Sequence, residues 1–557
     1  MRWLSSGWSS TLWPRSSCES LAACHSARLC SPASLTLPDF AIRPHFSELT
    51  APHASAVLLD HGVSALRKVF FDSAVGATLL PDVLPYASAA LHQAAPAPLR
   101  RLAVQLLAQL AVSDAERRGA GTEQLLAAVG DEDTGVALEA ERGLRALAAA
   151  PNGLDLLLGR QQARLRGMAA SADPVLRARA LALLLGLASA SPVAAAAVHD
   201  AGLLSKLVEE LGRAEDLLSC MAALQLVEGA AAQCDAGMAA ALGEAVGCQL
   251  AGLLRHEEPL LRCAALQAAA ALVALSLERG PAGMDADAAA ALADAPGLSP
   301  AASAQLDQAL FAALKSSLDV SSQEEVLGEE EEAALDAVSM LSHGASGAAV
   351  LLLQPGGVAS DVAYKALGRP PSPAVRMAAL HALAALAGTE RAASGSRAAA
   401  LLPPAAEDAL RAAACEGAVA GGCASPAAAL LRQLQQPFLE HRVAAYRCLS
   451  ALLLRAWAAA EACTNGELLD LLLDPRTETG LQGCEWRHAC VAALAATLRA
   501  ETAATGAAAT GAANGFSAHH TIFREMLPRV DAAARAGPFG AGQAAPAEHL
   551  VATVSGT

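Results

Sequence analysis

Aromatic and charged residues are scarce in this sequence of 557 residues: aromatics make up 3% and charged residues 17%. Strands favour aromatic and β-branched residues, whereas alanine, which accounts for about a quarter of the chain, is the strongest helix former. Hydrophobic residues make up 54% of the chain, which supplies ample apolar surface for a folded core. The composition therefore predicts an all-α protein and excludes a strand-rich fold.

Concentrated basic charge and paired cysteines are missing as well. The 39 Lys and Arg residues are outnumbered by 55 Asp and Glu residues, which gives a formal net charge of −16. No segment gathers the basic residues that a phosphate-binding surface needs, so we expect no nucleic acid partner. The 13 Cys residues form no C-x-x-C pair, as expected of small core residues in a reducing compartment rather than of disulfides or zinc ligands.

Common catalytic motifs and a clear membrane span are also lacking. Residues 180–199 carry no formal charge, but their Ala- and Ser-rich middle ends at Pro192, which indicates two helices joined by a turn rather than a transmembrane helix. The sequence has no phosphate-binding loop, no H-E-x-x-H, no G-x-S-x-G and no dinucleotide-binding motif. We predict no enzymatic activity, no metal and no cofactor.

The first 45 residues differ in composition from the rest of the chain. They contain Trp3, Trp8 and Trp13, many Ser residues and almost no acid before Asp39. An acid-poor N-terminus rich in Arg and Ser is typical of an organelle transit peptide, but this segment lacks the periodicity of a targeting helix. We interpret it as a disordered leader or a gene-model extension, with a transit peptide as the alternative.

What the sequence does contain is a repeat. Most copies begin with Asp, Glu or Ser, often next to Pro, which is the pattern of a helix N-terminus, and apolar residues follow at helical spacing. The copies are PAPLRRLAV (96–104), DTGVALEAE (133–141), DPVLRARAL (173–181), EDLLSCMAA (215–223), EPLLRCAAL (258–266), SPAVRMAAL (372–380) and the variant QPFLEHRVAAY (436–446).

The spacing of these copies identifies the architecture. A small residue stands in the eighth place of each of the first five copies, where we expect two helices to cross closely. These residues are Ala103, Ala140, Ala180, Ala222 and Ala265. Their successive spacings of 37, 40, 42 and 43 residues match the armadillo and HEAT period. We therefore predict an all-α, armadillo/HEAT-like α-solenoid, which is a right-handed superhelix of helical repeats.

Composition divides the chain into four parts. Residues 1–45 form the leader, and residues 46–501 the solenoid, with Pro-, Gly- and Ala-rich loop insertions near 280–304 and 389–426. Residues 502–518 are an Ala-, Gly- and Thr-rich stretch that predicts a low-complexity linker. The remaining residues, 519–557, are expected to form a C-terminal helix and tail.

Two blocks carry a resemblance to a known family. The first is the run Gln436, Pro437, Phe438, Glu440 and the following Ala pair, continued by a helix that reaches Trp457. The second is the stop Gly537, Pro538, Phe539 after the last helix. In this order they resemble the 26S proteasome non-ATPase regulatory subunit 5 family, and the likeness spans roughly residue 60 to the C-terminus.

The resemblance implies an assembly chaperone of the proteasome regulatory particle. Such a protein would bind the C-terminal domain of a base ATPase subunit on its concave face and leave before the mature 26S proteasome forms. It would act as a monomer in the cytoplasm, or also in the nucleus, without a membrane. A generic armadillo adaptor or scaffold for transport or signalling remains the alternative, and an organelle lyase built from HEAT repeats is a more distant one.

In armadillo proteins the last helix of each repeat lines the concave groove that binds a partner. We therefore choose the candidate partner contacts from two Leu-rich segments that we expect to form such helices. These candidates are Lys206, Glu209, Glu210, Glu467, Asp470 and Asp474. For each of them an ordinary solvated helix face is the alternative. We expect Phe438 and Trp457 to lie in the core, because large aromatic side chains are rare in this chain.

Overall fold

The computed structural model describes most of the chain from Ala56 onward. The described residues are 56–71, 80, 83–91, 95–233, 236–278, 300–319, 328–354, 357–370, 372–393, 397–508 and 519–540. The expected leader, most of the 280–304 insertion, residues 509–518 of the expected linker and the tail after 540 lie outside these residues. The contacts divide the chain into two units, Met1–Glu210 and Leu211–Thr557.

The described residues contain helices and no strand, so the all-α prediction is confirmed. In the first unit the helices are α4 (Ala56–Phe71), α6 (Leu84–Ala90), α7 (Ala97–Ser113), α8 (Arg118–Ala128), α9 (Thr134–Ala149), α10 (Gly153–Asp155), the π-helical turn η2 (Leu156–Arg160), α11 (Gln162–Ala169), α12 (Pro174–Ala188), α13 (Pro192–Asp200) and α14 (Ser205–Leu211), whose last residue begins the second unit. Within this unit α7 packs against α9, and α9 packs against α12.

The second unit is built in the same way from longer helices. They are α15 (Leu217–Ala231), α16 (Ala236–Leu253), α17 (Pro259–Glu278), α19 (Pro300–Leu318), α20 (Gly328–Leu341), α21 (Ala345–Leu353), α22 (Val358–Leu367), α23 (Pro373–Leu386), α24 (Thr389–Ala393), α25 (Arg397–Ala400), α26 (Pro404–Ala420), α27 (Pro426–Leu434), α28 (Leu439–Leu452), α29 (Ala456–Thr464), α30 (Gly466–Leu473), α31 (Leu481–Ala508) and α32 (His520–Ala536).

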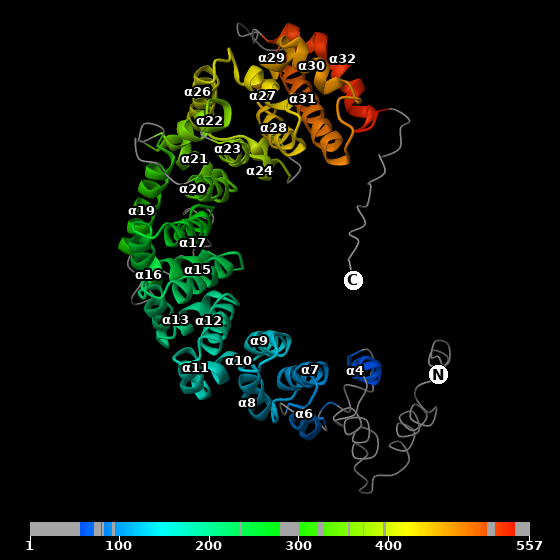
Figure 1. The fold of residues 1–557 in the computed structure, drawn as a ribbon. Helices are drawn as coiled ribbons and strands as arrows, with labels where there is room; N and C mark the ends of the chain where they lie inside the picture. Colours follow the sequence, from blue (N-terminus) through cyan, green and yellow to red (C-terminus); the bar gives the residue numbers. More distant parts are fainter. Residues whose placement is uncertain are drawn as a thin grey trace, which may run out of the picture. The chain divides into compact units, whose positions relative to one another are not determined.

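Helices of the second unit stack in two rows (Figure 1). In the first row α15, α17, α20, α23, α28 and α31 each pack against the next, and in the second row α16 packs against α19, α19 against α22, and α22 against α26. Along its own row each helix packs against the next one, and it also packs against helices of the other row, as α17 does against α16 and α23 against α22. Stacking of this kind is how a helical solenoid buries its core. This arrangement confirms the predicted α-solenoid.

Helix starts follow the capping chemistry that the repeats predicted. The side chains of Asp133, Asp173, Asp216 and Ser372 each accept a hydrogen bond from a backbone N–H in the first turn of their helix. Pro occupies the first turn after Asp173 and Ser372, where its missing N–H costs nothing. Local sequence thus fixes where these helices begin.

The predicted small residues at helix crossings are confirmed in four of five repeats. Ala103, Ala140, Ala180 and Ala265 have no exposed surface. The prediction for Ala222 is wrong, because the side chain of Ala222 is half-buried and that of its neighbour Ala223 is buried. The reason is the register: the cap of this helix is Asp216 rather than Glu215, so every position in the copy shifts by one residue.

The structure corrects two of the expected irregular segments. Residues 389–426 contain the full helix α26 rather than an extended loop, and a Cβ at Gly417 or Gly421 would collide with the backbone carbonyls of Ala363 or Leu367 in α22. Glycine therefore allows these two helices to approach closely. In addition, α31 continues through Ala508, into the stretch where we expected a linker.

Two stretches of the chain are apolar enough to resemble a membrane span. The uncharged run 180–199 forms α12 and α13 with a break between them, as predicted. Among the described residues, one helical segment, Pro259–Leu277 in α17, is long and apolar enough to cross a membrane by length and composition alone. In this structure α17 packs against α15, α16 and α20 as part of the first row.

Candidate functional site

The helices α7, α12, α17 and α28 share an arginine in their fourth position that binds a carboxylate further along the chain. We call this pair an arginine clasp. The clasps are Arg100–Asp131, Arg177–Glu210, Arg262–Glu330 and Arg442–Glu478, with shortest N–O distances of 2.9, 3.0, 2.6 and 2.9 Å. Each acid lies later in the same unit, either in a helix, as Glu210 and Glu330 do, or in a loop between helices, as Asp131 and Glu478 do. The clasp therefore ties its helix to a later part of the stack.

The arginine of each clasp also turns back onto its own helix start. Arg262 Nη1 donates to the carbonyls of His256 and Glu257, at 2.8 and 2.9 Å, and Arg177 Nη1 donates to the carbonyl of Ser171 at 2.8 Å. Sequence reasoning missed these residues, although an Arg stands in five of the seven repeat copies. Its recurrence three residues before the small Ala was the signal that could have found it.

The clasp at Arg442 has the most deeply buried acid of the four. Arg442 Nε and Nη2 each donate to Glu478 at 2.9 Å, and the hydroxyl of Tyr446 donates to the same carboxylate at 3.1 Å. The Glu478 side chain is only 1% exposed. The Glu478 hydrogen bonds raise the pKa of Arg442 above its usual value, whereas burial, followed by the nearby Glu478 charge, raises the pKa of Tyr446.

This clasp explains the Gln-Pro-Phe block. Arg442 Nη1 donates to the carbonyl of Gln436 at 3.1 Å and to that of Pro437 at 2.8 Å, so the block supplies backbone acceptors that fix the start of α28. The expectation that Phe438 lies in the core is wrong, because its side chain is 64% exposed. Phe438 is the cap residue of α28. It therefore precedes the first turn of the helix and is not one of the residues that α28 buries against its neighbours.

The other family-motif residues lie at the end of the described chain and in α29. Arg487 in α31 donates to the carbonyl of Leu472 at 2.6 Å and to that of Pro538 at 2.7 Å. Gly537 before it has φ +79°, a conformation that suits glycine, and ends α32. Phe539 and Trp457 are half-buried, and the indole Nε1 of Trp457 is buried without a hydrogen-bond partner among the described residues.

Only part of the first candidate contact group is exposed. Lys206 and Glu209 pair with each other on α14 at 2.8 Å. The expectation of an exposed contact is wrong for Glu210, which is 5% exposed and forms the clasp with Arg177. A buried carboxylate that completes an ion pair is needed for packing, so it is not available to a partner.

The second candidate group is exposed but engaged in local contacts. Glu467 accepts a hydrogen bond from Gln435 at 2.7 Å. Asp470 pairs with Arg529 of α32 at 2.6 Å, although both side chains are more than half exposed. Asp474 is exposed and accepts from the backbone N–H of Arg476 at 2.9 Å. Their role as partner contacts remains a prediction.

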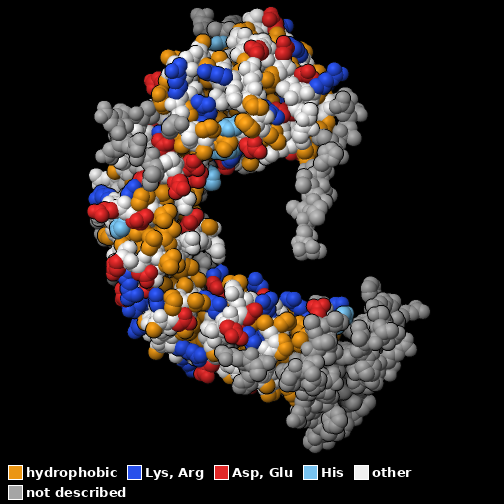
Figure 2. Space-filling view, in the orientation of Figure 1, with side chains coloured by type: hydrophobic (Ala, Val, Ile, Leu, Met, Phe, Trp, Pro, Cys, Tyr) orange, Lys and Arg blue, Asp and Glu red, His pale blue; other side chains and the backbone are white. Residues whose placement is uncertain are grey.

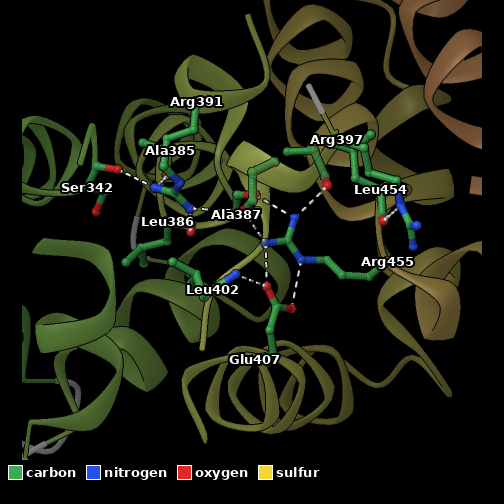
Figure 3. Close-up of polar contacts among 12 residues, drawn as sticks. Ser342, Ala385, Leu386, Ala387, Arg391, Arg397, Leu402, Glu407, Leu454 and Arg455 are labelled. Carbon is green, nitrogen blue, oxygen red and sulfur yellow. Dashed lines mark hydrogen bonds and ion pairs between the residues drawn. The ribbon is translucent and has the colours of Figure 1, made fainter. Parts of the chain in front are cut away.

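A buried cluster of arginines organises the segment that we expected to be a loop (Figure 3). Arg455 donates through two nitrogens to Glu407 of α26, both at 3.0 Å, and through Nη1 to the carbonyl of Ala387 at 2.6 Å. Arg391 of α24 donates to the carbonyls of Ser342 and Leu386 at 2.5 and 2.9 Å. Burial, followed by the Arg455 charge, lowers the pKa of Arg391 to about 10.

A third polar cluster lies between α23 and α28. Arg447 Nη1 lies 3.0 Å from His381 Nδ1, and Arg447 Nη2 pairs with Glu390 of α24. Burial, followed by the charge of Arg447, lowers the pKa of His381. The neutral imidazole therefore accepts the hydrogen bond from the guanidinium.

These clusters have structural explanations, and none has the composition of a catalytic centre. Among the described residues no group of three or more His, Cys, Asp or Glu side chains could hold a metal ion. Acidic and basic side chains are interspersed over the described surface that faces the viewer in Figure 2.

Comparisons with known proteins give likenesses of fold alone. No family model and no curated protein matches the chain. Among solved structures it is similar to an engineered protein at 19% identity over 80% of this chain and 98% of that chain, with a TM-score of 0.37. It is also similar to a designed armadillo repeat protein at 21% identity over 52% of this chain and 98% of that chain, with a TM-score of 0.31. Another designed armadillo repeat protein, in complex with a (KR)4 peptide, is 18% identical over 47% of this chain and 98% of that chain, with a TM-score of 0.28.

Proposed function

We propose that this protein is a protein-binding scaffold rather than an enzyme. The observation that carries this proposal is the use of its ionisable groups: the clasps and the Arg391–Arg455 cluster bind carboxylates and carbonyls of their own chain. A stack of helical repeats offers a partner a long surface made of many helices. Binding is therefore the activity that such a surface supports best.

Within this class, we propose an assembly chaperone of the proteasome regulatory particle base, acting in the cytoplasm. The support is the resemblance of the Gln436–Glu440 block, Trp457 and the Gly537–Phe539 stop to the subunit 5 family. In the structure Arg442 binds carbonyls of the first block and Arg487 binds the carbonyl of Pro538. Both motifs thus supply backbone carbonyls that a buried or half-buried arginine binds.

The chaperone would work by occupying the C-terminal domain of a base ATPase subunit. Occupation of that domain blocks premature docking onto the core particle, and release follows from competition when the base joins it. No nucleotide hydrolysis by the chaperone is needed for this cycle. The mechanism requires a stable surface and reversible binding.

The test is a pull-down from cell extract with the tagged full-length chain as bait and separate probes for base ATPases and core-particle subunits. Recovery of base ATPases without core particle is the expected result. Recovery of base and core particle together would contradict a chaperone that leaves before assembly is complete. Recovery of neither, or of transport cargo instead, would place the protein among generic armadillo adaptors.

A further inference from the structure

One first-row helix has the arginine of a clasp but no carboxylate. Arg376 is the fourth residue of α23, the same place that Arg177, Arg262 and Arg442 hold in their helices. In those three clasps the Nε atom lies 2.9 to 3.0 Å from a glutamate oxygen. Arg376 Nε is buried without a hydrogen-bond partner among the described residues, and Arg376 Nη2 donates to the carbonyl of Gly368 at 3.3 Å.

In two of the four clasps the acid has the same place relative to the helix that follows it. Asp131 stands three residues before the first residue of α9, and Glu478 stands three residues before the first residue of α31. Three residues before α28, the corresponding position is Gln436. The Gln436 side chain is exposed, and its Nε2 donates to the carbonyl of Arg432 at 3.3 Å.

A second arginine adds positive charge at this place. Arg432 of α27 is exposed, donates to the carbonyl of Gly421 at 3.0 Å and lies against the thiol of Cys423. No ion pair is formed by Arg376 or Arg432 within the described part of the chain. Burial, followed by repulsion from Arg432, lowers the pKa of Arg376. The carbonyls at the ends of α22 and α26 offer these two guanidinium groups only partial negative charge.

An exposed aromatic side chain follows Arg432 by six residues in the sequence. Phe438 is 64% exposed and its ring centroid lies 6.1 Å from that of His441. Phe438 follows Gln436 by two residues, and Gln436 contacts the backbone of Arg432. Arginine and large aromatic residues are the side chains that most often dominate protein interfaces.

We propose that Arg376, Arg432 and Phe438 form a docking surface for an acidic peptide segment of a partner protein, one that carries Asp or Glu next to an aliphatic or aromatic residue. The partner carboxylate would bind the exposed guanidinium of Arg432, with the positive charge of Arg376 beside it, since arginine binds carboxylates through paired hydrogen bonds. The apolar residue would cover Phe438. This goes beyond the proposed chaperone function, because it defines the chemistry of the ligand whatever protein supplies it.

The charge of the whole chain makes the proposal easy to test. With a net charge of −16, non-specific electrostatics favour a basic peptide over an acidic one. We therefore suggest fluorescence anisotropy with the full-length chain and three labelled peptides, made of four Leu-Glu-Glu, four Leu-Gln-Gln or four Leu-Lys-Lys triplets. The expected order of affinity is Leu-Glu-Glu first, with the other two clearly weaker.

Variants locate the binding at the proposed surface. Arg432→Glu and Phe438→Ala change exposed side chains, and each should weaken binding of the Leu-Glu-Glu peptide by about tenfold. Gln436→Glu should weaken it as well, because its own carboxylate competes for the arginines. Arg524→Glu and Leu218→Ala are matched exposed controls on α32 and α15 and should bind as the unchanged chain does.

Two results would overturn the proposal. One is a Leu-Lys-Lys peptide that binds as well as the Leu-Glu-Glu peptide or better. The other is that the Arg432→Glu and Phe438→Ala variants both bind the Leu-Glu-Glu peptide as tightly as the unchanged chain does. Circular dichroism checks that these variants are folded. The pull-down with proteasome probes is a separate measurement, so either proposal can fail while the other stands.

Discussion

The helices α28 and α23 place an arginine in the same position and use it differently. Arg442 is held by Glu478 and by two loop carbonyls, whereas Arg376 binds one carbonyl at 3.3 Å and has Arg432 as its charged neighbour. The arginine thus turns toward a backbone carbonyl in both repeats, but the acid that completes the clasp is present in only one. A repeat protein can therefore keep a structural residue and, by omitting its partner, leave unbalanced charge.

Removing the acid from the complete clasp should have the largest effect. Glu478→Gln leaves Arg442 without a countercharge at a carboxylate site that is 1% exposed, and loss of one partner of a buried pair costs about 3–5 kcal/mol. Urea unfolding followed by circular dichroism measures this change. Glu467→Gln is the exposed control and should stay within about 0.5 kcal/mol of the unchanged chain. Equal stability of both variants would show that the clasp contributes little.

A larger side chain at the buried position of α15 should have the next largest effect on stability. Counting from Asp216, the fourth residue of this helix is Cys220, which is why this repeat has no clasp. Ala223 is 2% exposed, so Ala223→Leu should overpack the helix crossing and cost about 1–3 kcal/mol. Ala222→Leu, at the half-buried neighbour, should cost less. Urea unfolding followed by circular dichroism measures both variants. The reverse order would restore the register that starts at Glu215.

Completing the missing clasp should stabilise the second unit slightly. Gln436→Glu places a carboxylate three residues before α28, as Glu478 is before α31, and an exposed ion pair contributes about 0–1 kcal/mol. Gln435→Glu is the matched control, and it should destabilise, because Gln435 donates to Glu467 at 2.7 Å and two acids would repel each other. Urea unfolding measures both variants. If their urea midpoints shift in the same direction, Gln436 is not the place of the missing acid.

Acidification should give the smallest effect, at the same α23–α28 interface. Because burial lowers the pKa of His381, the unfolded chain binds a proton more readily than the folded chain does. The stabilising contribution of neutral His381, which faces Arg447 and Glu390, is complete above about pH 6.5 and is lost as the pH falls below that value. His381→Gln should therefore lose less unfolding free energy between pH 7.5 and pH 5.5, and equal losses in both chains would refute the assignment.

Features that depend on neighbouring residues could be predicted from the sequence. The helical composition, the caps at Asp133 and Asp173, and the break in residues 180–199 all involve interactions within about one helical turn. The repeat period also located Ala103, Ala140 and Ala265 at buried positions. The proteasome-related resemblance is also a statement about sequence and remains to be tested by binding experiments.

Contacts between distant residues were decided only by the tertiary structure. Arg100 and Asp131 are 31 residues apart and Arg262 and Glu330 are 68 residues apart, so no local pattern says which acid each arginine binds. The same applies to Glu210, which pairs with Arg177 instead of facing a partner. Ion pairs depend on the distance between side chains after the helices have stacked, and one turn of difference in helix or loop length changes that distance. The sequence therefore determined that helices repeat, and their packing determined which charges remain without a partner.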